Sequence, residues 1–174
     1  MVNLQLLNQM SEQDFIDTLG EIYERAAWVA AGAADSRPFK SIDSLHQSMA
    51  KVVQGETKGK KLELIRAHPN LGDSMEMSVK SQEEQQGAGL NDLSPEELEK
   101  FRAMNQLYMD QFDFPFIIAV KGKDKNTIYQ AMEKRIRHSS TEEFETALLE
   151  IHQIAFYRLQ DKIREENTYD QSYK

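Results

Sequence analysis

The sequence predicts an all-α fold: a single helical-bundle domain of about eight helices over residues 1–166, with a polar C-terminal tail at 167–174. Apolar residues recur at helical spacing in most segments, and capping patterns precede several of these segments. Glycine and proline are few, 8 and 4 among 174 residues. Only one short stretch fits an extended chain better than a helix, and it has no partner strand elsewhere.

The N-terminal half contains four expected helices. The first begins at Ser11, where Asp14 completes an approximate capping box, and its apolar positions continue to Gly32. Residues 33–39 are expected to form a loop. The next helices begin after Ser41, span residues 57–68 and carry Ser81, Glu84 and Gln85; their expected ends are Gly55, His68 before Pro69, and Gly87 with Gly89.

Three further helices are expected in the C-terminal half. Ser94, Pro95 and Glu97 form a helix start with a cap, a proline at the first position and an acid three residues after the cap. Asn126 is expected to cap the following helix. Ser140 and Glu143 form a further capping box in front of the longest helix, 141–166.

Between these helices, residues 112–120 form a short apolar run bounded by a proline and by Lys121-Gly122-Lys123. The run is too short and irregular for a helix, and an extended segment crossing the interior is expected. Without a partner strand, its backbone N–H and C=O groups need other partners, and a bound ligand is one candidate.

Composition excludes several classes of function. The net charge is −8 and the isoelectric point is near 5.1, which argues against sequence-independent binding of nucleic acid or of an anionic membrane. No run of 18 apolar residues could span a membrane. There is no cysteine, which excludes disulfides and thiolate zinc sites and is compatible with the reducing cytosol. The four histidines lack the spacing of a metal site.

One helix face carries an unusual set of polar groups. Ser81, Glu84 and Gln85 stand at i, i+3 and i+4 and therefore project from one side of their helix. A hydroxyl, a carboxylate and a carboxamide on one stripe suit a small polar ligand. The alternative is an ordinary solvated face, because glutamate and glutamine are mostly exposed.

His68 and Arg158 are the other candidates for chemistry. His68 stands at a helix end and is either a histidine bonded to backbone or a general acid/base. Arg158 lies on the apolar stripe of the last helix, where it must extend to solvent, pair with a buried carboxylate or bind an anion. A histidine, a glutamate, an arginine and amides together suit a small anionic heterocycle or acid.

Four blocks, in this order, resemble the 2-oxo-4-hydroxy-4-carboxy-5-ureidoimidazoline (OHCU) decarboxylase family, and the resemblance covers roughly residues 8–163. The blocks are Arg66-Ala67-His68-Pro69-Asn70-Leu71, Ser81-x-x-Glu84-Gln85-x-x-Ala88-Gly89-Leu90, Phe114-Pro115-Phe116-Ile117-Ile118-Ala119-Val120-Lys121-Gly122, and Ile151-x-x-Ile154-x-x-x-Arg158-Leu159. One departure is visible: Asn70-Leu71-Gly72-Asp73 stands where the family usually has Asp-Leu-Ala-Gly.

The resemblance implies a cytoplasmic, all-α, cofactor-free enzyme, commonly a homodimer, which makes (S)-allantoin from OHCU in urate breakdown. Some family members are fused to a urate oxidase domain. The resemblance implies His68 as the catalytic histidine, with Glu84 and Arg158 as further catalytic groups. The implied substrate contacts are Pro69, Ser81, Gln82, Glu83, Glu84, Gln85, Phe116, Ile117, Ile118, Ala119, Val120 and Arg158.

Two other functions remain open from the residues themselves. One is a non-catalytic helical interaction domain that has kept the fold, and the other is a ureide hydrolase. Decay of fresh urate oxidase product on addition of the protein separates an enzyme from an interaction domain. Release of carbon dioxide without ammonia separates a decarboxylase from a hydrolase.

Overall fold

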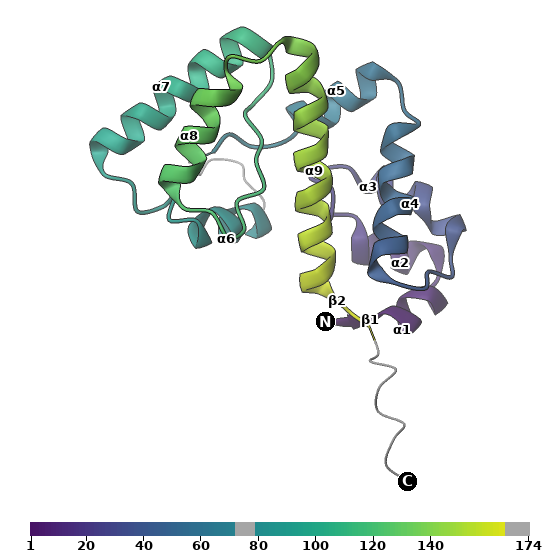
Figure 1. Cartoon of the computed structure of the whole chain (residues 1–174). Helices are drawn as coiled ribbons and strands as arrows, with labels where there is room; N and C mark the ends of the chain where they lie inside the picture. The colour runs from purple at the N-terminus through teal and green to yellow at the C-terminus, as the bar shows by residue number, and fades with distance from the viewer. Residues whose placement is uncertain (72–78, 166–174) are drawn as a thin grey trace. The chain divides into compact units, whose positions relative to one another are not determined.

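The computed structural model describes residues 1–71 and 79–165, with residues 79–82 described by their backbone alone. In this described part the fold is all-α, as predicted, with nine α-helices, one 3-10 turn and two strands of two residues each (Figure 1). No helix among the described residues is long and apolar enough to cross a membrane. The expected tail, 167–174, lies outside the described residues.

The elements follow one another along the chain with short connections. They are β1 Val2–Asn3, α1 Leu4–Gln9, α2 Glu12–Leu19, α3 Ala27–Ala33, the 3-10 helix η1 Ala34–Ser36, α4 Ile42–Gln54, α5 Lys58–Arg66, α6 Val79–Gly87, α7 Pro95–Phe112, α8 Lys125–Arg135, α9 Ser140–Lys162 and β2 Ile163–Arg164.

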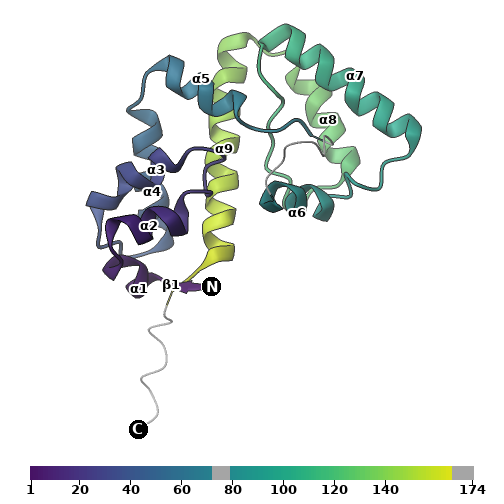
Figure 2. The ribbon, with the colours of Figure 1, turned by 180° about the vertical axis from the view of Figure 1, so that it is seen from behind.

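These elements form two compact units. Unit 1 comprises Met1–Glu56 and Ala155–Lys174, and unit 2 comprises Thr57–Ile154. In unit 1, α3 packs against both α2 and α4, and these three helices are seen together in Figure 2. The two short strands pair in parallel, with Val2 opposite Ile163. This pairing is a correction, because the sequence analysis expected no strand partners in the chain.

The first expected helix is in fact two helices. Ser11 caps α2 as predicted, since its hydroxyl accepts a hydrogen bond from the N–H of Asp14 at 3.1 Å. The helix ends at Leu19, and α3 begins only at Ala27. Between them Arg25 adopts a left-handed conformation with φ of 52°, which no helix can contain. The prediction of one helix continuing to Gly32 was therefore wrong.

Two predicted helix starts were also wrong, in both cases by one or two residues. Asp124, not Asn126, caps α8 by accepting a hydrogen bond from the N–H of Thr127 at 2.8 Å. At α9 the reciprocal cap joins Ser139 and Glu142, with hydrogen bonds of 3.2 and 2.8 Å, in place of the expected Ser140 and Glu143. The other predicted starts, at Ser41 and at Ser94 with Glu97, are confirmed.

Segment 116–120, the central part of the predicted extended run, is buried and belongs to neither a helix nor a strand. Figure 1 shows it within the loop that links α7 to α8. Its first residue joins an aromatic cluster: the ring of Phe116 lies 5.3 Å from that of Tyr108, edge to face. The structure thus confirms a buried, non-helical segment at the place where the hydrophobic period changes.

Candidate functional site

His68 lies just past the end of α5, as the proline after it predicts. The helix ends at Arg66, and the backbone N–H of His68 donates to the carbonyl of Ile65 at 3.2 Å. The residue is largely buried, with 9% of its surface exposed. His68 is thus held at the start of a connection, not in the middle of a packed helix face.

Helix α7 holds this stretch of chain on both sides of His68. On one side the guanidinium Nε of Arg66 donates to the carbonyl oxygen of Asp113 at 3.0 Å, and Arg66 also pairs with the Asp113 carboxylate. On the other side, the amide nitrogen of Asn105 donates to the carbonyl oxygen of Leu71 at 2.9 Å. The two contacts fix the backbone that carries His68. The unusual part of the turn, Gly72-Asp73, lies outside the described residues.

Helix α6 turns the predicted face inward. Glu83 is exposed, Glu84 is half-buried and Gln85 is buried, in agreement with the face expected from their spacing. The carbonyl of Gln85 accepts hydrogen bonds from the N–H groups of Ala88 and Leu90 beyond the helix end. Gly89 has φ of 75° and makes this ending possible. The side chains of Ser81 and Gln82 lie outside the described residues.

Arg158 is almost completely buried, with 3% of its surface exposed, and it pairs with a buried carboxylate. Its Nη1 lies 3.1 Å from Oε2 of Glu24, which is itself 2% exposed. The same nitrogen donates to the carbonyl oxygens of Ile22 at 3.3 Å and Glu21 at 3.4 Å. Of the alternatives left open by the sequence, extension to solvent is therefore excluded. The partner carboxylate comes from the break between α2 and α3.

The backbone of segment 116–120 finds partners among side chains of unit 2. Arg135 Nη1 donates to the carbonyl of Ile117 at 2.6 Å. Glu150 Oε2 accepts from the N–H of Ala119 at 2.8 Å, and the Lys123 ammonium donates to the carbonyl of Ala119 at 2.7 Å. These partners meet much of the need that the sequence analysis assigned to other groups or to a ligand.

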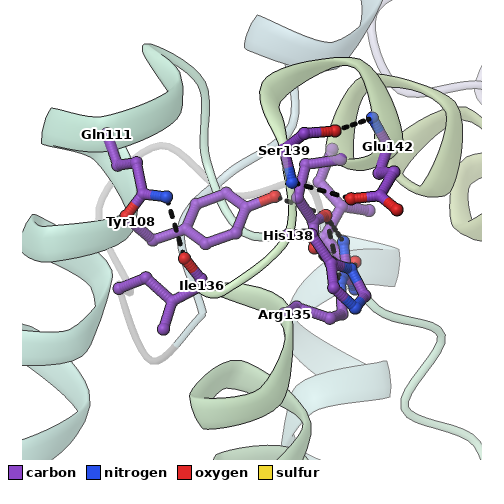
Figure 3. Close-up of polar contacts among 9 residues, drawn as sticks. Tyr108, Gln111, Arg135, Ile136, His138, Ser139 and Glu142 are labelled. Carbon is purple, nitrogen blue, oxygen red and sulfur yellow. Dashed lines mark hydrogen bonds and ion pairs between the residues drawn. The ribbon is translucent and has the colours of Figure 1, made fainter.

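A buried polar cluster lies beside this segment in unit 2 (Figure 3). The carboxylate of Glu143, which is wholly buried, accepts hydrogen bonds from the guanidinium of Arg135 at 2.8 to 3.1 Å and from the hydroxyl of Tyr108 at 2.8 Å. His138 Nδ1 lies 3.3 Å from Glu143 Oε1, without the alignment of a hydrogen bond.

The cluster changes the proton affinities of its members. Burial raises the pKa of Tyr108, and the negative charge of Glu143 raises it further. Burial alone would lower the pKa of Arg135, but the hydrogen bonds and charge of Glu143 outweigh that effect and raise it. Tyr108 is therefore a neutral donor and Arg135 a permanent cation at any pH at which the protein is folded.

The sequence analysis did not single out the four residues Glu24, Arg135, Glu143 and Glu150. A signal existed for two of them. Arg135 follows Ile128 and Met132 on the buried side of α8, and Glu143 precedes Ala147 and Ile151 on the buried side of α9. A charge on an apolar stripe was the argument applied to Arg158, and it would have identified both residues.

Among the predicted site residues, His68, Glu84, Gln85 and segment 116–120 belong to unit 2, and Arg158 belongs to unit 1. Within the described ranges, no group of three or more histidine, cysteine, aspartate or glutamate side chains could hold a metal ion.

Comparisons with known proteins agree with the four sequence blocks. The family model described as OHCU decarboxylase matches residues 8–160. A protein of Halalkalicoccus jeotgali named 2-oxo-4-hydroxy-4-carboxy-5-ureidoimidazoline decarboxylase is 50% identical over 155 residues, which cover 89% of this chain and 88% of that protein. The uric acid degradation bifunctional protein PucL of Bacillus subtilis is 45% identical over 95% of this chain, which spans 33% of that protein.

A solved structure is also similar. The crystal structure of (S)-allantoin synthase superposes with a TM-score of 0.79 at 33% identity, over 94% of this chain and 54% of that one. The match therefore extends from the sequence blocks to the arrangement of the backbone. On the evidence of the family model, the relatives and the fold, the chain belongs to the OHCU decarboxylase family.

Proposed function

We propose that this chain catalyses the decarboxylation of OHCU to (S)-allantoin in urate breakdown, without a metal or an organic cofactor. The observation that carries the proposal is family membership along residues 8–160, with 50% identity to a relative that bears the decarboxylase name. The buried His68, held beside a turn by α7, adds a group that can exchange protons.

The chemistry of the substrate accounts for a reaction without a cofactor. The carboxylate of OHCU is attached to C4, next to C5, which is doubly bonded to nitrogen. When the bond to the carboxylate breaks and carbon dioxide leaves, the electron pair delocalises into C5=N, as it does in a β-keto acid. The protein need only orient the substrate, stabilise the redistributed charge and deliver one proton to one face.

The proposed roles follow from the side chains. His68 moves the proton at the reacting carbon, and one-sided delivery gives a single enantiomer. Glu84, half-buried on α6, accepts N–H hydrogens of the ureido group or the ring, and Gln85 contributes an amide beside it. Arg158 binds an anionic or carbonyl group of the substrate. Glu24 neutralises this arginine and fixes its orientation in the described structure.

Further substrate contacts are proposed from the family resemblance. They are Pro69, the polar stretch Ser81, Gln82 and Glu83, and the backbone of segment 116–120. Glu83 is exposed, so its role is the weakest in physical terms and it provides a natural control. Within the described part of the chain, the N–H of Ile118 makes no hydrogen bond to the protein, which suits a contact with a ligand.

We also propose a cytoplasmic homodimer that acts together with a urate oxidase, either fused to it or associated with it. The lack of cysteine fits a reducing compartment. A relative whose name describes a bifunctional protein of uric acid degradation, and of which this chain spans 33%, supports a link to a second activity in the same pathway.

The test is to add the purified protein to freshly made product of urate oxidase and to follow the optical signal of that product. Faster decay than in buffer, with release of carbon dioxide and no ammonia, is expected. Circular dichroism should then show one enantiomer of allantoin, whereas the spontaneous reaction gives the racemate. An unchanged decay would favour a non-catalytic interaction domain, and release of ammonia would favour a ureide hydrolase.

A further inference from the structure

Segment 116–120 is buried, yet its backbone is held by side chains of two helices and not by a sheet. Arg135, at the end of α8, binds the carbonyl of Ile117 at 2.6 Å. Glu150, in the middle of α9, binds the N–H of Ala119 at 2.8 Å. Such bonds to charged side chains are stronger than those between neutral groups. The two helices therefore fix the position of the segment.

The spacing of the held groups has a direction. Residues 117 and 119 stand two apart, and in an extended chain alternate residues direct their backbone groups to opposite edges. The side-chain partners thus occupy one edge, and the backbone groups of Ile118 belong to the other. The N–H of Ile118 makes no hydrogen bond within the described part of the protein, in agreement with this assignment.

Arg135 is itself held on several sides, which makes it a rigid support. Its Nε and Nη2 bind the carboxylate of Glu143, and its Nη1 is directed to Ile117. The face of the guanidinium lies 4.3 Å from the ring centre of Phe116, a cation–π contact with the same segment. Figure 3 shows Arg135, His138 and Tyr108 converging at this point.

We propose that Arg135 and Glu150 are positioning residues: they hold segment 116–120 so that the Ile118 edge of its backbone meets the substrate. This inference rests on the proposed function and adds to it two residues that do not themselves touch the substrate. A displacement of about 1 Å in a group that orients a substrate can cost on the order of 100-fold in rate.

The two residues call for different substitutions. Glu150 is half-buried, so Glu150→Ala removes the acceptor for the Ala119 N–H without leaving a buried charge. Glu150→Gln retains an oxygen at that position. Arg135→Lys keeps a cation beside Glu143, but a single ammonium cannot bind both the carboxylate and the Ile117 carbonyl in the planar fork of arginine. Glu145→Ala, at an exposed position of α9, is the matched control.

The experiment measures kcat and KM for OHCU, thermal unfolding, and amide hydrogen exchange of a peptide that contains residues 116–120. For Glu150→Ala we expect a fall of roughly 10- to 100-fold in kcat/KM. Its melting temperature should match that of wild type, and its exchange should be faster only near the segment. Glu150→Gln should recover most of the lost activity, Arg135→Lys should resemble Glu150→Ala, and Glu145→Ala should behave as wild type.

Three results would overturn the inference. Wild-type kcat/KM in folded Glu150→Ala would remove Glu150 from the positioning role. Faster exchange in the segment at unchanged activity would make the contacts structural only. An inactive wild-type protein would instead refute the proposed function, and the positioning role with it. The wild-type assay therefore distinguishes failure of the function from failure of the inference.

Discussion

Breaking the Arg158–Glu24 pair should destabilise the protein severely, whereas removing both charges should not. Arg158 and Glu24 are 3% and 2% exposed, so either single substitution leaves a charge in a dry interior. Loss of one partner of a buried ion pair costs about 3–5 kcal/mol. For a chain of this length each kcal/mol lowers the melting temperature by about 2–4 °C, so Arg158→Met should lower it by about 6–20 °C.

The matching double variant, Glu24→Gln with Arg158→Met, leaves no charge behind. Its free energy of unfolding should lie within about 1–2 kcal/mol of wild type, because apolar or neutral replacement of a buried pair is often close to neutral. If Arg158 binds substrate, this stable variant should still lose activity by roughly 10- to 150-fold, the equivalent of one hydrogen bond to a charged group.

Chemical denaturation of the four proteins in this cycle gives the coupling energy, and steady-state assays with OHCU give kcat/KM. A double variant with wild-type kcat/KM would exclude Arg158 from substrate binding. Single variants that each cost less than about 1 kcal/mol, with no coupling, would contradict the buried pair itself. The structure thereby alters the expectation from sequence alone, in which Arg158→Met keeps the stability of the fold.

Three further outcomes are expected. His68→Asn should slow turnover by about 10²–10⁴-fold, and the product should shift toward racemic allantoin by circular dichroism; one enantiomer at wild-type rate would exclude His68 from proton transfer. Glu84→Gln should greatly reduce activity at nearly unchanged stability, whereas exposed Glu83→Gln should be near neutral; equal effects would contradict the assignment of the buried face of α6. The Ser139 N–H lowers the pKa of Glu142 from 4.5, so this cap contributes fully above that pH and is lost as pH falls through the lower folded value; thermal unfolding between pH 6 and 3 should show this loss, with a smaller acid dependence in Glu142→Gln.

The start of α9 shows how far local pattern can reach. The stretch Ser139-Ser140-Thr141-Glu142-Glu143 offers a capping box in two registers, one residue apart. The sequence alone cannot choose between them, because both satisfy the same spacing. The choice is tertiary: Glu143 is required by Arg135 and Tyr108 in the interior, which leaves Glu142 for the cap.

The site shows the same division. Helical spacing predicted which side of α6 turns inward at Glu84 and Gln85, and a change of period predicted the non-helical course of segment 116–120. Spacing could not identify Glu24 as the partner of Arg158, because 134 residues separate them. Nor could it anticipate the break that presents Glu24, since Arg25 in a left-handed conformation has no glycine or proline to announce it.

The parallel pairing of β1 with β2 has a consequence for the order in which the protein folds. Val2 pairs with Ile163, so unit 1 needs residues from both halves of the chain, whereas unit 2 is one continuous stretch, Thr57–Ile154. Contacts between distant residues require the closure of a long loop and form slowly. During synthesis, the residues of unit 2 are therefore complete first, while the helices made earliest wait for the end of α9. Pulse-labelled hydrogen exchange during refolding should accordingly protect α7 and α8 before α1.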